Sequence, residues 1–448
     1  MAFNNLFFIF LFAPVVVALY HVVPKRAKNL FLLAASYVFY AWGDIANLPF
    51  LFLLTIMDYA IGLLLDRLYG RRNAGARLLL TFGVLLNLAF LAVFKYTSIG
   101  MPLGVSFYTF STLSYLFDVY QGRAEGEPNF IDMALYVSFF PKVISGPIVQ
   151  YGDMRERIDD RQPSWGLFCG GLTLFVSGLV KKVIFADTLS GVFGTLYAME
   201  QPTVVSSWLT VIAYSLELYL DFSGYSDMAI GLAALFGFKF DKNFDHPYES
   251  KSMREFWKRW HISLGAWFLD YVYIPLGGNR CSKFRQFLNL MVVWVLTGIW
   301  HGATINFVFW GLYHGVLVCL EHFALKEKQR EWPTWLRIIV TDLLAGIGWV
   351  FFFAPTASEA LACLQHMVGI GVPLASGATL YYLQSNFLLI ALAVLASSTL
   401  PRRGITRMLQ ARSSIFSTLV AACYVICFVI CVAFMVGNTY VPFLYFKF

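Results

Sequence analysis

The sequence predicts an all-α, polytopic integral membrane protein. Of its 448 residues, 59% are hydrophobic and only 13% are charged, and the mean hydropathy is +0.66. Soluble domains carry about 25% charged residues, so this composition excludes an ordinary globular protein. The hydrophobic residues also fall into runs long enough to cross a bilayer as helices, and we count about eleven such spans.

Basic residues at the ends of the first hydrophobic runs predict the orientation of the chain. Residues 6–23 are expected to form a first membrane helix and not a cleaved signal peptide, because the basic residues follow this run. Further runs cover 29–43, 48–65 and 78–94. Basic loops stay in the cytoplasm, so the N-terminus is expected outside. The two basic clusters are Lys25, Arg26 and Lys28, and Arg67, Arg71, Arg72 and Arg77.

The pattern becomes less regular from residue 102. Pro and Gly interrupt the hydrophobic runs in PLGVSFYTF from Pro102 and in FPKVISGPIVQY from Phe140. Broken helices at membrane depth are tolerated only where protein buries them or where they line a cavity. We therefore expect residues 102–321 to form a core that encloses a cavity. Residues 1–97 and 336–448 would add N-terminal and C-terminal helices to a single membrane-embedded domain, 1–448.

The remaining hydrophobic runs complete the predicted bundle. Their basic ends explain the net charge of +7 as a topology signal, so we do not expect a nucleic-acid partner. Lys181 and Lys182 are expected to mark one cytoplasmic end, and Arg402, Arg403 and Arg407 another. The runs are 167–180, 183–197, 204–220, 288–300, 303–320, 338–353, 387–400 and 416–436.

Residues 256–271 predict an amphipathic helix in the cytoplasmic interface. Apolar and aromatic residues recur there at the spacing of one helix face, with Arg254 and Lys258 on the other side. His261 lies at the border, where its imidazole could point into a cavity, although an incidental interface histidine is the alternative. The apolar face comprises Phe256, Trp260, Leu264, Trp267, Phe268 and Tyr271.

His301, in the sequence GIWHG, is the main catalytic candidate. An ionisable side chain at membrane depth is costly, so it calls for a function or a packing partner. Small neighbours such as Gly302 would let a substrate approach the imidazole while Trp300 shields it. An imidazole can accept and return a proton near neutral pH. A purely packed histidine is the alternative.

Other polar residues receive weaker assignments. His314 would lie about 140° from His301 on a continuous helix, so we interpret it as a packing residue. Ser223 is not in a nucleophile elbow, which favours polar lining or helix capping. The cysteines show no spacing typical of a metal site or a disulfide framework. A basic group could bind lipid head groups or the phosphates of a thioester donor; its members are Arg254, Lys258, Arg259 and Arg280.

Taken together, these motifs resemble the membrane-bound O-acyltransferase superfamily, in particular its bacterial polysaccharide branch, which acts in alginate O-acetylation. The resemblance runs in order from about Pro102 to the C-terminus. The motifs that carry it are FPKVISGPIVQY, DFSGYSDMAIGLAALFGFKFDKNFDHPYES, FWKRWHISLGAWFLDYVYIPLGGNR, LTGIWHGATINFVFWGLYHG and PFLYFKF.

The resemblance implies a ring of helices around a tunnel, with a catalytic histidine at His301 and a second family histidine at His261. It implies no tightly bound cofactor and an acyl thioester donor, acetyl-CoA, that enters from the cytoplasm. A periplasmic acetyltransferase partner would complete transfer to a polysaccharide, which places the chain in the bacterial inner membrane with its N-terminus in the periplasm. The alternatives are D-alanyl transfer to teichoic acid and a transporter or flippase with a histidine proton relay.

Overall fold

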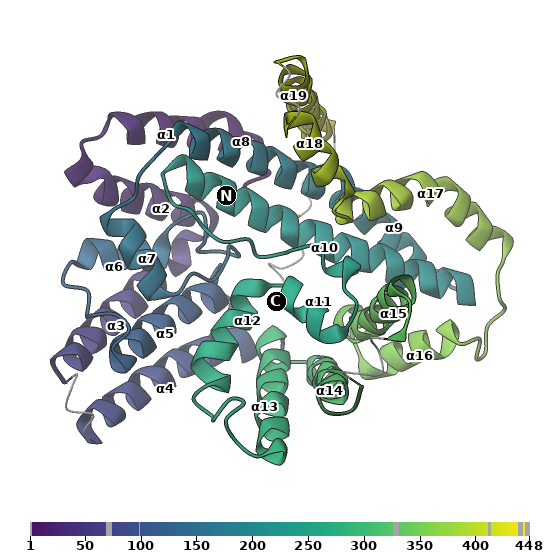
Figure 1. The fold of residues 1–448 in the computed structure, drawn as a ribbon, viewed down its shortest axis with the longest axis horizontal. Coiled ribbons are helices and arrows are strands. Elements are labelled where there is room, and N and C mark those ends of the chain that lie inside the picture. Colours follow the sequence, from purple (N-terminus) through teal and green to yellow (C-terminus); the bar gives the residue numbers. More distant parts are fainter. Residues whose placement is uncertain are drawn as a thin grey trace. The chain divides into compact units, whose positions relative to one another are not determined.

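The computed structural model describes residues 2–68, 74–97, 99–325, 331–410, 414–437 and 442–443. These residues form α-helices joined by short π and 3-10 segments, with no strand among them (Figure 1). The helices are α1 Ala13–Val22, α2 Lys28–Asp44, α3 Leu48–Leu68, α4 Ala74–Tyr96, α5 Val105–Gln121, α6 Phe130–Ser138, α7 Tyr151–Asp159, α8 Trp165–Val180, α9 Asp187–Tyr197, α10 Val204–Leu235, α11 Met253–Arg259, α12 Ile262–Phe268, α13 Lys283–His301, α14 Ile305–Leu320, α15 Thr334–Phe353, α16 Ala357–Met367, α17 Gly377–Ser397, α18 Leu400–Gln410 and α19 Ser414–Gly437.

Seven helical stretches in the described part of the chain are long and apolar enough to cross a membrane. The all-α membrane architecture is thereby confirmed, with fewer spans than the count of about eleven from hydropathy. One reason is that two of the stretches each combine two hydrophobic runs that were counted separately from the sequence. A second reason is that α10 and α13, which carry more polar side chains, are not among the seven. The seven are Lys25–Leu68, Ala74–Tyr96, Trp165–Tyr197, Ile305–Leu325, Thr334–Phe353, Gly377–Ser397 and Ile415–Gly437.

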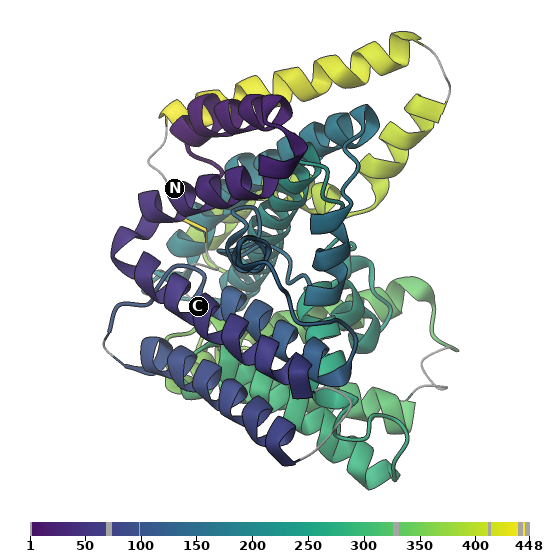
Figure 2. The same ribbon diagram turned by 90° about the vertical axis from the view of Figure 1, so that its left-hand side faces the viewer.

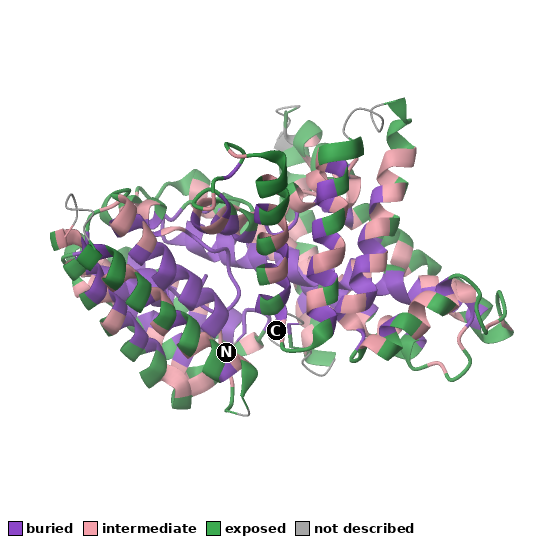
Figure 3. Ribbon diagram, turned by 90° about the horizontal axis from the view of Figure 1, so that it is seen from below, coloured by how far each residue is buried: buried purple, intermediate pink, exposed green. Residues whose placement is uncertain are grey.

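The described residues divide into two compact units. The first falls within Met1–Phe175 and Tyr225–Lys242, and the second within Val176–Gly224 and Asn243–Leu444. Within each unit, buried residues line the sides where helices face one another, and exposed residues lie on the outer sides (Figure 3). Two predicted features fall outside the described residues: Arg71 and Arg72 of the second basic cluster, and most of the terminal PFLYFKF motif.

In the first unit, α3, α4 and α5 lie side by side (Figures 1 and 2). Three buried polar side chains join them. The Asn87 amide donates a 2.8 Å hydrogen bond to Asp58 Oδ1, and the Thr112 hydroxyl donates a 2.6 Å bond to Asn87 Oδ1. These hydrogen bonds offset part of the cost of burying polar groups in an apolar interior.

The irregular segment predicted around FPKVISGPIVQY is confirmed, since no helix covers residues 139–150. The segment is buried, so its backbone needs partners inside the protein. The backbone N–H of Phe140 donates to the Ser36 hydroxyl at 3.0 Å, and the Tyr136 hydroxyl donates to the carbonyl of Val149 at 3.1 Å. Side chains therefore supply part of the hydrogen bonds that a helix would have made, and backbone turns such as Lys142 N–H to the carbonyl of Phe139 supply others.

The prediction that Lys182 marks a cytoplasmic end is wrong. The chain continues from α8 through a π segment, Lys181–Ala186, into α9, and Lys182 is buried within this helix. Its ammonium lies 2.6 Å from Asp221 Oδ1 on α10 and 2.8 Å from Asp187 Oδ1. A buried charge is tolerated when it is paired. The sequence interpretation expected water to solvate this ammonium, and the two carboxylates take that role instead.

The motif DFSGYSDMAIG lies within α10, which extends fifteen residues beyond the predicted end at residue 220. Capping is therefore the wrong interpretation for Ser223. Asp221, whose hydropathy suggested the end of a membrane run, instead faces Lys182 inside the second unit. The helix can continue because the lysine compensates the charge that would otherwise require water.

The predicted amphipathic helix is also interrupted. All six residues of its apolar face are buried, as the spacing predicted, but the backbone breaks between α11 and α12 at His261. His261 has φ 45°, the left-handed conformation that residues with a Cβ rarely adopt. The hydrophobic period thus identified the buried face but not the change in helix direction.

Candidate active site

The helices α13 and α14 form a hairpin whose backbones touch. A Cβ on Gly298 would lie 2.3 Å from the carbonyl oxygen of Phe307, and a Cβ on Gly311 would lie 2.4 Å from that of Trp294. These contacts need glycine because any larger residue would push the helices apart. The hairpin fixes the end of α13, where His301 is the last helical residue.

His301 is 3% exposed and is enclosed by aromatic rings. Its imidazole centroid lies 4.7 Å from the Trp300 ring and 5.0 Å from the rings of Trp310 and Phe352. The carbonyl end of α13 favours a positive charge at this position. Burial among these rings disfavours the charged form, so the two effects act in opposite directions on the imidazole.

His261 occupies the break between α11 and α12 and is also 3% exposed. Phe222 packs edge-on against its ring at 4.8 Å. Asn243 fixes the start of α12, since its side-chain oxygen accepts from the backbone of Ser263 at 3.1 Å and its carbonyl accepts from the backbone of Ile262 at 2.9 Å. This support holds His261 in its left-handed conformation, which costs on the order of 1 kcal/mol or more.

Burial lowers the pKa of His261 to about 3. The segment lies outside the seven candidate spans, and desolvation of the charged form is the main cause of the shift. At neutral pH this imidazole is uncharged, so it can serve as a hydrogen-bond donor or acceptor but not as a fixed cation.

Trp300 brings the two predicted histidines together. Its ring centroid lies 4.7 Å from that of His301 and 6.4 Å from that of His261. The helices that carry these histidines are separate in the sequence, so this proximity is a tertiary feature. The three residues form one aromatic cluster in the second unit.

The four residues of the predicted basic group differ in their exposure and in their partners. Lys258 and Arg280 are exposed, whereas Arg254 and Arg259 are half-buried. The Arg259 guanidinium is engaged with Glu255 one turn away and with the carbonyl of His246 at 3.5 Å. A guanidinium paired in this way has less positive charge to offer a phosphate than the exposed members of the group.

His314 lies in a box of tryptophans. Its ring is fully buried, with centroids at 4.8 Å from Trp257, 5.0 Å from Trp310 and 5.7 Å from Trp294. The helix that the sequence interpretation assumed between His301 and His314 is broken at 302–304, so the angle between them does not follow from a single helix. Trp310 contacts both imidazoles and links this box to the His301 cluster.

The pairing of Lys182 with Asp221 was not predicted from the sequence. A signal was present, since a lysine and an aspartate both lay inside or beside membrane-length runs, and an intramembrane ionisable residue commonly has a charged partner. Periodicity alone does not identify that partner.

Comparison with known proteins identifies the family of the chain. The model of the MBOAT, membrane-bound O-acyltransferase, family matches residues 32–353. The chain belongs to this family. As a member of the membrane-bound O-acyltransferase family, it is a multi-pass membrane protein and an O-acyltransferase, and the match includes both His261 and His301.

Three individual relatives differ in how closely they match the chain. A Pseudomonas aeruginosa protein named probable alginate O-acetylase is 40% identical over 421 residues, covering 88% of this chain and 81% of the relative. A peptidoglycan O-acetyltransferase of Helicobacter pylori is 34% identical over 425 residues, covering 82% and 80%. A teichoic acid D-alanyltransferase of Bacillus subtilis is 28% identical over 271 residues, covering 56% of this chain and 68% of the relative.

Proposed function

We propose that this acyltransferase passes an acetyl group from cytoplasmic acetyl-CoA across the membrane for O-acetylation of an exopolysaccharide such as alginate. A periplasmic acetyltransferase partner would complete the transfer. The similarity to the Pseudomonas aeruginosa protein, at 40% identity over 88% of the chain, supports this function over D-alanyl transfer, for which the matching relative covers 56%. The chain would lie in the inner membrane with its N-terminus in the periplasm.

In this proposal His301 is the general base. Its imidazole takes the proton of the acceptor hydroxyl as the hydroxyl oxygen attacks the thioester carbonyl. The C–S bond breaks, the new C–O ester bond forms, and the imidazolium returns its proton to the leaving thiolate. The observation that carries this assignment is the position of His301 as the last residue of α13, because the carbonyl end of a helix favours the transient positive charge. Burial among aromatic rings keeps the resting imidazole neutral, so it is able to accept a proton.

His261 is proposed to orient a substrate. Burial lowers the pKa of its imidazole and so favours the neutral form at physiological pH. The Trp300 ring lies 6.4 Å from that of His261 and 4.7 Å from that of His301. The acceptor hydroxyl belongs to a sugar or to a serine of the partner. Trp300 would shield the reacting atoms from water. The phosphates of the donor would be held by the basic group, Arg254, Lys258, Arg259 and Arg280. Its exposed members, Lys258 and Arg280, are the better placed to reach them.

The test uses inverted membrane vesicles from the host, which present the cytoplasmic face to the medium. Radiolabelled acetyl-CoA is added, and alkali-labile label in the polymer is counted for the parent and for His301→Gln. We expect the variant to lose at least about 100-fold in rate, the size of a general-base contribution. His21→Ala is the matched control, since His21 is exposed on α1.

A folded His301→Gln protein that transfers label at the parental rate would refute the base assignment. Label from D-alanyl carrier protein in place of acetyl-CoA would favour the teichoic acid reaction. Movement of sugar across the membrane without any acyl transfer would favour the transporter.

A further inference from the structure

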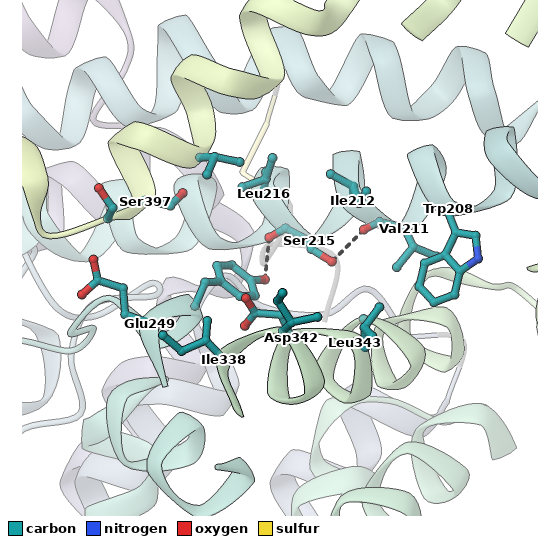
Figure 4. A pocket seen from close by; sticks show the side chains of 15 residues that line it. Trp208, Val211, Ile212, Ser215, Leu216, Glu249, Ile338, Asp342, Leu343 and Ser397 are labelled. Carbon is teal, nitrogen blue, oxygen red and sulfur yellow. Dashed lines mark hydrogen bonds between the residues drawn. The ribbon is translucent and has the colours of Figure 1, made fainter. Parts of the chain in front are cut away.

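A cavity of about 460 Å³ lies in the second unit, away from the histidine cluster, and is open to the outside of the unit. Its walls come from α10, α15, the end of α17 and the 3-10 turn Pro247–Glu249. The volume falls in the range of about 300–1,000 Å³ that is common for small-molecule sites. Figure 4 shows Asp342 rising from α15 between Ile338 and Leu343 and facing Ser215 on α10.

The hydrogen-bond donors that line the cavity are already used within the protein. The Ser215 hydroxyl donates to the carbonyl of Val211 at 2.6 Å, and the Tyr248 hydroxyl donates to the carbonyl of Ser215 at 2.7 Å. The Trp208 indole donates to the carbonyl of Met367 at 3.0 Å. The hydroxyls of Ser397 and Ser398 likewise donate to carbonyls one turn earlier.

The lining therefore offers acceptors rather than donors. Its charged side chains are Asp342 and Glu249, and no lysine, arginine or histidine is among the lining residues. Glu249 Oε1 already accepts from the backbone and the hydroxyl of Thr399. Asp342 Oδ1 is buried and has no hydrogen-bond partner in the described part of the chain.

The position of Asp342 makes this carboxyl costly. It follows Thr334, the first residue of the membrane-length helix α15, by eight residues, which is about 12 Å along the axis. A carboxyl at such a depth, with a buried oxygen that nothing in the described structure satisfies, indicates a ligand that donates to it.

We propose that this cavity binds a membrane-partitioned amphiphile with an apolar chain and a primary ammonium head group. The ammonium would donate to Asp342, and the chain would lie along the apolar walls formed by residues such as Ile212, Leu216 and Val394. The lining has two carboxyl groups and no cation, so it gives the carboxylate of a fatty acid no positively charged partner. A neutral alcohol carries one donor and no charge, so it gains less from the same site.

Binding is tested on the full chain in phosphatidylcholine nanodiscs, a lipid whose head group has no N–H donor. Radiolabelled dodecylamine, which is an ammonium at neutral pH, is titrated and compared with dodecanol and dodecanoate as competitors. We expect saturable binding of dodecylamine, with dodecanol and dodecanoate competing at least about tenfold more weakly, since hydrogen bonds to charged groups contribute about 1.5–3 kcal/mol.

Two variants locate the site. Asp342→Asn should weaken dodecylamine binding by about tenfold or more, and Ile338→Trp should abolish it by filling the cavity. The matched controls are Asp241→Asn, whose carboxylate is exposed, and Leu388→Trp, whose side chain is 68% exposed on α17. Both controls should bind as the parent does.

Thermal unfolding in the same nanodiscs shows whether each variant is folded. If folded Asp342→Asn binds dodecylamine with the parental Kd, or if dodecanol competes as well as dodecylamine itself, the proposal is overturned. If Asp342→Asn fails to fold, Ile338→Trp and the three-ligand comparison on the parent still decide it. This binding test does not use the acetyl-transfer assay. The proposed amphiphile site can therefore be refuted without refuting the proposed acetyl transfer, and the reverse also holds.

Discussion

The imidazole of His261 lies 6.4 Å from the indole of Trp300, although His261 lies in the break between α11 and α12 and Trp300 lies near the end of α13. Trp300 precedes His301 directly and contacts that imidazole as well. One tryptophan therefore sets the relative positions of both histidines, and its removal should disturb the two together.

Trp300→Ala tests this arrangement. Truncating a buried tryptophan costs about 3–5 kcal/mol of folding free energy, and the cavity would let both imidazoles shift. We expect a lower melting temperature and a loss of acetyl transfer of at least about tenfold, while Trp300→Phe retains part of both. Transfer assays on vesicles and scanning fluorimetry measure the two effects. Parental activity in Trp300→Ala would show that the indole does not position the histidines.

His261→Asn distinguishes the effect of backbone strain at position 261 on stability from the role of the imidazole in acetyl transfer. Asparagine adopts the left-handed conformation more readily than histidine, so the variant should fold with a melting temperature at or above that of the parent. Its transfer rate should nevertheless fall, because the orienting imidazole is gone. Among the described non-glycine residues only His246 shares the positive φ, at 49°, so His246→Asn is the matched control and should keep its activity. Equal rates in both variants would contradict the role of His261.

The buried pair of Lys182 and Asp221 predicts non-additive stability. Lys182→Met alone leaves the carboxylates of Asp221 and Asp187 without their shared partner and should cost about 3–5 kcal/mol. Adding Asp221→Asn removes one of the two uncompensated charges and leaves that of Asp187, so the double variant should be more stable than Lys182→Met. Melting temperatures in detergent measure the cycle. Additive losses would mean that the two groups do not interact energetically.

Gly298→Ala tests the hairpin of α13 and α14. The added Cβ would lie 2.3 Å from the carbonyl oxygen of Phe307, so the helices must separate and His301 must move. We expect a lower melting temperature and slower transfer. Gly191→Ala is the control, because nothing lies within 4 Å of a Cβ there, and a helical alanine should stabilise by up to about 1 kcal/mol. If the two variants had the same melting temperature and transfer rate, close helix packing would not be the reason that position 298 requires glycine.

Glu127 predicts a pH effect on stability. Burial raises the pKa of this carboxyl, which lies between α5 and α6 outside the candidate spans. The folded state then holds its proton more tightly than the unfolded state. The resulting stability is fully present below the unfolded pKa of about 4.3 and is lost as the pH rises through the folded pKa. Glu127→Gln removes this dependence, so the difference in melting temperature between parent and variant should change with pH across that window. A constant difference would contradict the shift.

Much of the architecture was predictable because hydropathy is a local property. Runs of apolar residues identified the membrane helices, and the helical spacing of 256–271 identified its buried face. Pro and Gly in FPKVISGPIVQY predicted a break that the structure contains. The candidate residues His301 and His261 were also found from sequence, since histidine in an apolar or amphipathic segment is unusual enough to stand out.

Other features depended on partners that are distant in the sequence. Whether Lys182 ends a helix or lies inside one depends on Asp221, and no local pattern contains that information. The break at His261 depends on Asn243, which holds the start of α12. The sequence alone therefore determined that this is a membrane protein with two notable histidines. Only the tertiary structure decided that Trp300 joins them and that Lys182 is internal, because the free energy of a buried polar or charged group depends on the partner that the fold brings to it.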